Sequence, residues 1–311
     1  MVNKLSNKTL IIVFVVLLAI VVMFMINDSK HGDRSFRNTL VNIDTANVSS
    51  INIYPEATNH KEVRIYKVGN EWRVTLANGK TALVPQSKIQ EVFTQLLAFK
   101  PIGVAAQDKD KWHEYQVDSA GTRIKVYEGS KNSLDMTIGK FAFHQPRSMS
   151  TFVRVADDDN VYEVMGFMSY EFNHDANYFR DDRVVNDNPD NWNKLTFTYP
   201  ADSSFQLIKV KSNWEVNGQN TDSLKVANYL NTISRITDPN FIDDPGSSLL
   251  SKSKYTLTIQ TSSLGAITVS AFADSSNIAV NSTQFPGTYF DGKKADFWKR
   301  IYVGKESFIK K

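Results

Sequence analysis

The chain of 311 residues contains no cysteine. This excludes a disulfide framework, a thiolate metal site, a thiol nucleophile and a lipidated cysteine. A strong charge bias is also missing, because 36 Lys and Arg against 33 Asp and Glu give a net charge of +3. Basic and acidic residues are interleaved throughout, so no concentrated basic surface forms. We therefore expect no nucleic acid among the partners.

Signature motifs of catalysis are missing as well. The sequence has no phosphate-binding GxxxxGK[ST], no GxGxxG, no GxSxG and no HExxH. Its five histidines include no pair at i, i+4 spacing: His31, His60, His113, His144 and His174. We therefore predict no catalytic residue, no cofactor and no metal ligand, and we predict that the protein is not an enzyme.

The sequence has one long apolar run, Leu10 to Ile26 (LIIVFVVLLAIVVMFMI). At roughly 1.5 Å per residue it reaches the lower end of the length that spans a ~30 Å hydrocarbon layer. A cleaved signal peptide has a shorter apolar core and ends at small residues, whereas this run ends in Phe24-Met25-Ile26-Asn27-Asp28. The pattern favours a single transmembrane signal anchor over a cleaved signal peptide.

Orientation follows from the flanks of this run. Basic residues nearly balance across it, so the positive-inside count does not decide. A short tail without acidic residues is easily kept in the cytoplasm, and long C-terminal domains translocate largely regardless of charge. We expect a bacterial inner-membrane protein that contacts the bilayer through residues 10–26, with residues 27–311 in the periplasmic or other extracytoplasmic space. A content of 41% hydrophobic residues predicts that this part folds.

Two segments of the chain resemble each other. Tyr54-Pro55 is followed by Gly69-Asn70-Glu71-Trp72-Arg73-Val74, and Tyr199-Pro200 is followed by Ser212-Asn213-Trp214-Glu215-Val216. Each tryptophan follows a short polar turn between two runs of alternating apolar and polar residues. This pattern predicts two hairpins, with turns at Gly69-Asn70 and Ser212-Asn213. We expect most of the 19 Phe, 12 Tyr and 5 Trp to build sheet cores rather than a carbohydrate-binding platform.

A helix is predicted after each hairpin, over residues 88–98 and 224–236, because apolar residues recur there at spacings of three and four. Ser87 caps the first helix in this interpretation, and Asp222 or Ser223 caps the second. Further strands are predicted at 122–128, 134–138, 151–155, 161–164, 255–260, 266–271 and 277–280.

These elements predict an α+β fold made of two tandem, internally duplicated antiparallel-sheet domains. Each domain carries one packed helix, and a single transmembrane helix precedes them. The predicted organisation is a cytoplasmic tail (1–9), a transmembrane helix (10–26), a linker (27–47), a first repeat domain (48–185), a linker (186–193) and a second repeat domain (194–311).

The arrangement resembles an uncharacterised bacterial family, a domain of unknown function whose members carry an N-terminal membrane anchor. The residues that carry the resemblance are Gly69 to Val74, Ile138-Gly139-Lys140, Phe152 to Val155, Val161 to Val164 and Phe179 to Val185. Several such genes lie beside those for gliding-motility-type ABC transporters. The resemblance implies an accessory or scaffold role at a transporter, and it brings no catalytic residues.

Two clusters of polar residues are candidate catalytic or cation-binding sites. Trp112-His113-Glu114-Tyr115 contains an acid/base pair, but neighbours on a strand point to opposite faces, so we expect a solvated turn with anchoring aromatics. His174-Asp175 lies near Asp181-Asp182 in sequence, where carboxylates could hold a cation. Arg180 and Arg183 are close enough to neutralise these carboxylates, and we expect local ion pairing.

Three functions remain open. The first is a membrane-anchored accessory or scaffold protein that acts by protein–protein interaction, with a membrane protein such as an ABC transporter subunit as its partner. The second is an extracytoplasmic module that binds a glycan or peptide. The third is a hydrolase of unrecognised type that would use His113, Glu114, His174 and Asp175.

Overall fold

The computed structural model describes residues 37–145, 147–251 and 253–310, and the predicted membrane run at 10–26 lies outside them. Within these ranges no helix is both long and apolar enough to cross a membrane. The described chain is mostly antiparallel strand with few helices, and its strands belong to two sheets, β1 to β9 and β10 to β17.

Contacts divide the described chain into two compact units. The first unit comprises residues up to Glu62 together with Gln90–Asn173, and the second comprises Val63–Ile89 together with the residues from His174 onward. The predicted domain boundary at 186–193 stays a prediction.

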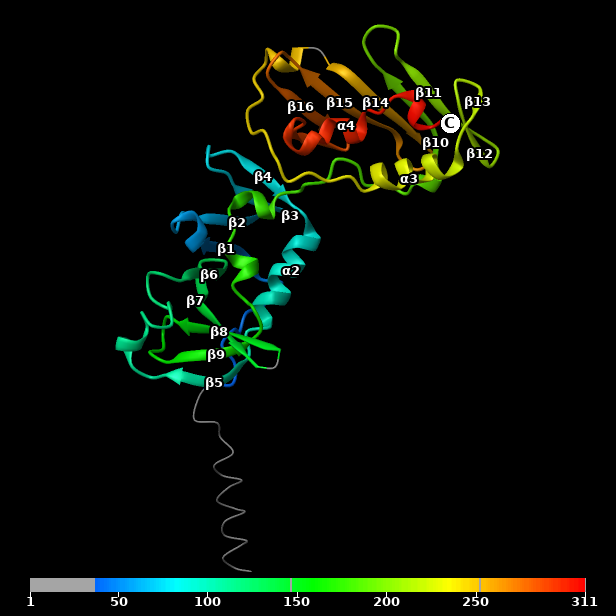
Figure 1. The fold of residues 1–311 in the computed structure, drawn as a ribbon. Coiled ribbons are helices and arrows are strands. Elements are labelled where there is room, and N and C mark those ends of the chain that lie inside the picture. The colour runs from blue at the N-terminus through cyan, green and yellow to red at the C-terminus, as the bar shows by residue number, and fades with distance from the viewer. Residues whose placement is uncertain (1–36, 146, 252, 311) are drawn as a thin grey trace, which may run out of the picture. The chain divides into compact units, whose positions relative to one another are not determined.

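The first unit contains six antiparallel strands in the order β1-β6-β7-β8-β9-β5 (Figure 1). The strands are β1 (Val48–Tyr54), β5 (Pro101–Ala106), β6 (Thr122–Glu128), β7 (Lys131–His144), β8 (Ser148–Val155) and β9 (Val161–Met165). Strand β6 has the predicted bounds, because its buried and exposed residues alternate as the sequence does. Strand β5 was not predicted, and its ladder with β9 is interrupted by two register shifts.

The two faces of this sheet differ in chemistry. Ile53, Ile124 and Met136 lie opposite one another across β1, β6 and β7 and are fully buried on the apolar face. On the other face, which we call the polar face, Arg123 lies opposite Thr137 and Thr137 opposite Arg154. Residues 107–121, here called the covering loop, pack onto the polar face. Their buried contacts include Val117 against Phe152 and Val161.

The second unit contains the meander β2-β3-β4 and an eight-stranded antiparallel sheet in the order β13-β12-β11-β10-β14-β15-β16-β17. The meander strands are β2 (Val63–Val68), β3 (Glu71–Thr75) and β4 (Thr81–Val84). The sheet strands are β10 (Trp192–Thr198), β11 (Phe205–Val210), β12 (Asn213–Val216), β13 (Gln219–Asn220), β14 (Ser253–Thr261), β15 (Gly265–Ala273), β16 (Ile278–Ser282) and β17 (Phe285–Asp291).

Two helices cover one face of this eight-stranded sheet, α3 (Ser223–Ser234) and α4 (Phe297–Ile301) (Figure 1). Both contribute to one hydrophobic core with the strands, and the Tyr229 hydroxyl of α3 donates to the Ile301 carbonyl of α4 at 2.7 Å. Asp222 caps α3 by accepting from the amides of Leu224 and Lys225, as predicted. The short helix α4 was not predicted.

Helix α2 (Gln86–Leu97) buries Ile89, Val92, Phe93 and Leu96, the spacing that predicted it. The predicted cap at Ser87 is wrong, because Ser87 lies inside the helix and the Pro85 carbonyl already accepts from the Ile89 amide. Short 3-10 turns complete the described chain: η1 (Glu56–Thr58), η2 (Lys109–Lys111), η3 (Tyr170–Phe172), η4 (Ala176–Phe179), η5 (Pro189–Asn191), η6 (Leu249–Ser251), η7 (Lys294–Asp296) and η8 (Lys305–Ser307).

Both predicted hairpins are present. Val68 pairs with Glu71, so Gly69-Asn70 forms the first turn as predicted, with Gly69 at φ +60°. Val210 pairs with Asn213, so the second turn is Lys211-Ser212, one residue earlier than predicted. In each case three meandering strands precede a helix, β2-β3-β4 before α2 and β11-β12-β13 before α3.

Candidate functional site

The predicted acid/base pair at 112–115 follows η2 in a turn of the first unit. His113 Nδ1 lies 2.9 Å from Asp118 Oδ2, and Glu114 pairs with Lys111 at 2.9 Å. Each ionisable side chain therefore has a partner outside the predicted pair. The aromatic residues anchor the turn, since Trp112 Nε1 donates to the Asp159 carbonyl at 2.9 Å.

The predicted local ion pairing near residue 181 is half right. Arg183 binds the buried carboxylate of Asp181 through two nitrogens, at 2.7 and 2.5 Å. Arg180 instead pairs with Asp243 at 2.6 Å, and its guanidinium lies 3.8 Å from the centre of the Phe241 ring. A partner distant in sequence neutralises Arg180, which spacing alone did not predict.

His174 and Asp175 begin the second unit's C-terminal part. The His174 ring stacks on Tyr178 with 3.9 Å between ring centres. The Asp175 side chain accepts from the Asn177 amide and caps η4. Both side chains therefore support the local turn, the role for which capping carboxylates are common.

A group of three polar residues on the polar face was not predicted. His144 Nε2 lies 2.8 Å from both Ser150 Oγ and Glu163 Oε1, and Ser150 Oγ donates to Glu163 Oε1 at 2.5 Å. In a Ser-His-acid triad the two imidazole nitrogens contact different partners, but here one nitrogen contacts both. Ser150 is also fully buried. The arrangement joins β7, β8 and β9 and does not present a nucleophile.

Exposed apolar side chains gather at the end of the β7–β8 hairpin. Phe141 is 52% exposed and Phe143 64% exposed, and Phe143 lies opposite Met149 in the ladder. The Phe167 ring lies 4.9 Å from that of Phe141 and 6.4 Å from that of Tyr170, centre to centre. We call these five residues the aromatic cluster. These residues are exceptions to the expectation that most aromatic residues build the cores, which many other buried Phe, Tyr and Trp side chains follow.

A pocket of about 680 Å³, lined by charged and aromatic side chains, opens between the covering loop and the polar face. We call it the Arg154 pocket. The Arg154 guanidinium stacks on Trp112, with 3.8 Å between the guanidinium carbon and the ring centre. Its Nε donates a hydrogen bond to the Val117 carbonyl at 3.1 Å. Burial lowers the pKa of Arg154, and the nearby charge of Arg123 lowers it further. Arg123 is itself neutralised by Asp135 through two hydrogen bonds of 2.7 Å.

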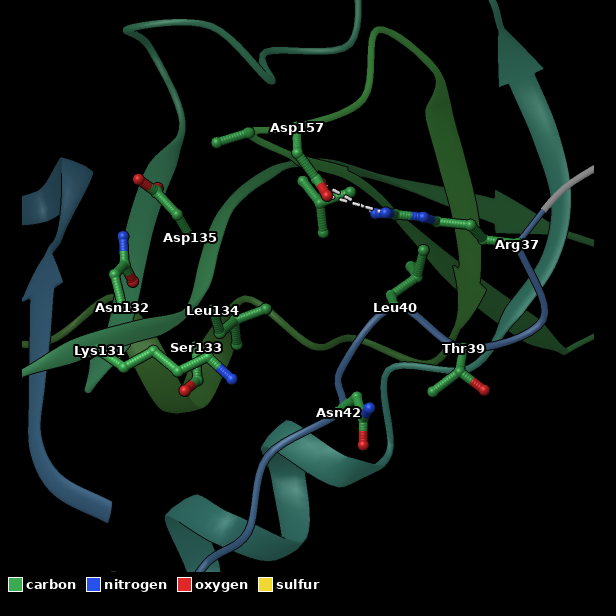
Figure 2. Close-up of a pocket in the computed structure, with 12 residues that line it drawn as sticks. Arg37, Thr39, Leu40, Asn42, Lys131, Asn132, Ser133, Leu134, Asp135 and Asp157 are labelled. Atoms are coloured by element: carbon green, nitrogen blue, oxygen red, sulfur yellow. Dashed lines mark hydrogen bonds and ion pairs between the residues drawn. The ribbon is translucent and has the colours of Figure 1, made fainter. Parts of the chain in front are cut away.

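A second pocket of the first unit, about 850 Å³, is lined by residues 37–42, 131–135 and 155–157. Figure 2 shows Arg37 reaching across it to Asp157, with which it makes two hydrogen bonds of 2.9 and 2.8 Å. The hydrogen bond from Arg37 lowers the pKa of Asp157, and the same bond raises that of Arg37. This ion pair fixes the start of the described chain to the turn between β8 and β9.

The family model of the domain of unknown function DUF4340 matches residues 76–258. The chain belongs to this family. The match covers more than half of the chain and runs from the end of the β3 strand region into β14. Comparison with curated proteins gave no match, and comparison with solved structures gave none either.

Family membership agrees with one part of the resemblance drawn from the sequence, namely that the chain belongs to an uncharacterised domain family. The functional features described above were missed for different reasons. Phe141 and Phe143 follow the alternation of core residues, yet both are exposed. The Arg154 pocket depends on strand neighbours and on a loop that folds back, so neither feature has a local sequence signal.

Proposed function

We propose that this protein is a membrane-anchored, extracytoplasmic accessory or scaffold protein that acts by binding another membrane protein through the aromatic cluster. The exposure of Phe141 and Phe143 beside Met149, Phe167 and Tyr170 carries this proposal. Contiguous exposed apolar surface is uncommon on monomeric proteins and marks interaction sites. Phenylalanine, tyrosine and methionine are also enriched in the cores of protein interfaces.

The short connection to the predicted anchor supports a partner in the same membrane. Ten residues separate Ile26 from Arg37, and ten residues span at most about 36 Å when fully extended. Because Arg37 is bound to Asp157, the first unit would be held close to the bilayer surface. Proteins embedded in that membrane are then the partners within reach, and a transporter subunit is one that the family resemblance suggests.

Hydrogen bonds on the polar face of the β7–β8 hairpin hold the aromatic cluster in a fixed geometry. The Ser150, His144 and Glu163 hydrogen bonds join β7, β8 and β9 on the polar face. The aromatic cluster lies on the other face, because Phe143 and Met149 alternate with Ala142 and Ser150 along the strands. A preorganised surface loses less conformational entropy on binding.

We also propose that the two sheets arose by internal duplication. Strand order β1-β6-β7-β8-β9 matches β10-β14-β15-β16-β17, and the meander β2-β3-β4 matches β11-β12-β13. Strand β5 also has a partial counterpart in the second sheet. Phe241 forms an isolated bridge with Phe290 of β17, at the position that corresponds to the pairing of β5 with β9. A duplicated domain suits a scaffold protein, because one copy can keep an existing interaction while the sequence of the other copy diverges to bind a different partner.

Site-specific photocrosslinking in native membranes tests the docking proposal. A benzophenone amino acid replaces Phe143 in the full chain, and the matched control replaces Leu224, which is 70% exposed on α3. We expect position 143 to give one dominant adduct with an integral membrane protein, identified by mass spectrometry, and position 224 to give none. Adducts only with lipid, only with a second copy of this chain, or equally at both positions contradict the proposal.

A binding module for a glycan or peptide is the second candidate, and the Arg154 pocket favours it. A hydrolase stays the third, and no geometry supports it. Its four candidate residues make other contacts: His113 pairs with Asp118, Glu114 pairs with Lys111, His174 stacks on Tyr178, and Asp175 caps η4. Simultaneous substitution of His113 and Glu114 is expected to leave the docking activity unchanged.

A further inference from the structure

Arg154 lines this pocket without a direct ion pair among the described residues, although the charges of Asp135, Asp159 and Asp118 act on it from a greater distance. No carboxylate lies within 4.0 Å of the Arg154 guanidinium among the described residues, and the single hydrogen bond recorded for it there is from Nε to the Val117 carbonyl. The two terminal amino groups thus form a fork without a protein acceptor in this part of the chain. These amino groups are not among the buried unpartnered atoms of the described residues, so an anion from solvent can reach them.

The acidic groups around the pocket are already engaged. Asp135 receives Arg123 through two hydrogen bonds, and Lys125 lies 4.0 Å away from it. Asp118 accepts from the Ala120 amide at 3.0 Å and pairs with His113. Rearranging either carboxylate toward Arg154 would therefore break existing bonds, so an external anion is the better acceptor.

Two contacts hold the Arg154 guanidinium in place, and a third holds the ring on which it stacks. Trp112 supports the guanidinium plane, the Val117 carbonyl fixes Nε, and the indole of Trp112 is itself fixed by the Asp159 carbonyl. A guanidinium fork with a fixed plane matches the two oxygens of a carboxylate. Preorganisation of this kind lowers the entropic cost of binding.

Size and lining narrow the ligand further. The pocket has about 680 Å³ and is walled by Tyr54, His60, Trp112 and Thr137 beside the two arginines. This volume falls in the usual range for small-molecule sites, and its aromatic walls suit a planar apolar group. Asp118 and Asp135 also line it, and their negative charges would repel a dianion more than a monoanion.

We propose that the Arg154 pocket binds a monoanionic carboxylate carried on a planar apolar group, with the carboxylate on the Arg154 fork. The site goes beyond the proposed docking function. It lies on the polar face, whereas the aromatic cluster lies on the apolar face, so the failure of one proposal leaves the other untouched.

Thermal unfolding of the purified full chain tests the site with benzoate as probe and benzamide as its neutral isostere. We expect the melting temperature to rise with benzoate concentration and not with benzamide, since a ligand that binds the folded state stabilises it. Arg154→Gln should weaken benzoate binding by about tenfold or more, the effect of removing charged hydrogen bonds. Arg147→Gln removes the same charge from an exposed position of the first unit and should leave the benzoate response unchanged.

Three outcomes would overturn the site. They are an equal response to benzamide, a response in Arg154→Gln equal to that of the unsubstituted chain, and tighter binding of phenyl phosphate than of benzoate. If Arg154→Gln does not fold, Arg154→Lys keeps the charge without the fork and is expected to lose affinity as well. Full benzoate affinity in Arg154→Lys would contradict recognition by a fork.

Discussion

Replacing Gly139 by alanine should destabilise the first unit, because the covering loop lies directly against this position. A Cβ built on Gly139 would lie 2.1 Å from the Tyr115 carbonyl oxygen and 2.8 Å from Val117 Cγ1. Contacts of real Cβ atoms begin near 3.0 Å, so the carbonyl must move by about 1 Å, a shift of the kind that overpacking enforces. The Lys140 amide donates to that same carbonyl at 3.0 Å, and this hydrogen bond would be strained too.

The magnitude follows from two contributions. Overpacking of a well-packed site costs about 1–3 kcal/mol, and loss of the Lys140–Tyr115 hydrogen bond costs about 0.5–1.5 kcal/mol. We therefore expect the free energy of unfolding to fall by about 1.5–4.5 kcal/mol in Gly139→Ala. The bulge in the β7–β8 ladder between Ile138 and Phe141 places this glycine, and it gives a physical reason for the Ile138-Gly139-Lys140 element.

Urea denaturation of the full chain measures the effect, with Gly103→Ala as the matched control. A Cβ at Gly103 meets no heavy atom within 4 Å, so this variant should be neutral or more stable by up to about 1 kcal/mol. Hydrogen exchange should show a faster-exchanging Lys140 amide in Gly139→Ala only. If Gly139→Ala is as stable as Gly103→Ala, the covering loop does not pack on the polar face as described, and the reasoning is refuted.

Two further predictions concern single contacts. Asp222→Ala removes the cap of α3, whose carboxylate accepts from the Leu224 and Lys225 amides, and should lower the free energy of unfolding by about 1 kcal/mol. In thermal melts, Asp222→Asn should recover most of this loss. An equal loss of stability in both variants would rule out capping. Arg37 lowers the pKa of Asp157, so their attraction is present above the unfolded pKa of about 3.9 and is lost as pH falls through the lower folded value. Because both side chains are partly exposed, the pair is worth at most about 1 kcal/mol. The protection factors of the amides at residues 37–42, which are exchange rates corrected for the intrinsic pH dependence, should fall below that pH, and this acid-dependent fall should be absent in Arg37→Gln.

Periodicity predicted the regular elements because their burial follows it. β6 alternates strictly, and α2 and α3 bury residues at spacings of three and four. The predicted helix cap and the predicted hairpin turn were wrong where a backbone hydrogen bond or the strand register overrode the local sequence preference. Ser87 was predicted as the cap, but the Pro85 carbonyl accepts the first hydrogen bond of the helix, two residues earlier. The second hairpin turn moved by one residue because Leu207 pairs with Val216, which fixes the register.

Sites were harder to predict than elements, because they depend on contacts between residues distant in sequence. Arg154 meets Trp112 only because the covering loop folds onto the polar face. Phe143 has the sequence pattern of a core residue, yet it lies at the hairpin end and is exposed. A pattern of alternation identifies a face, but it cannot tell where the cover over that face ends.

Strand β5 bears on how the border of this sheet avoids pairing with another molecule. It lies at the border of its sheet and reads PIGVAA, without a single charge to repel a neighbouring molecule. Pro101 has no N–H to donate, and the two shifts of its ladder with β9 bend the strand. A border of this kind offers no continuous template for a further strand. On this side, pairing with a further strand is therefore opposed by backbone shape rather than by electrostatic repulsion.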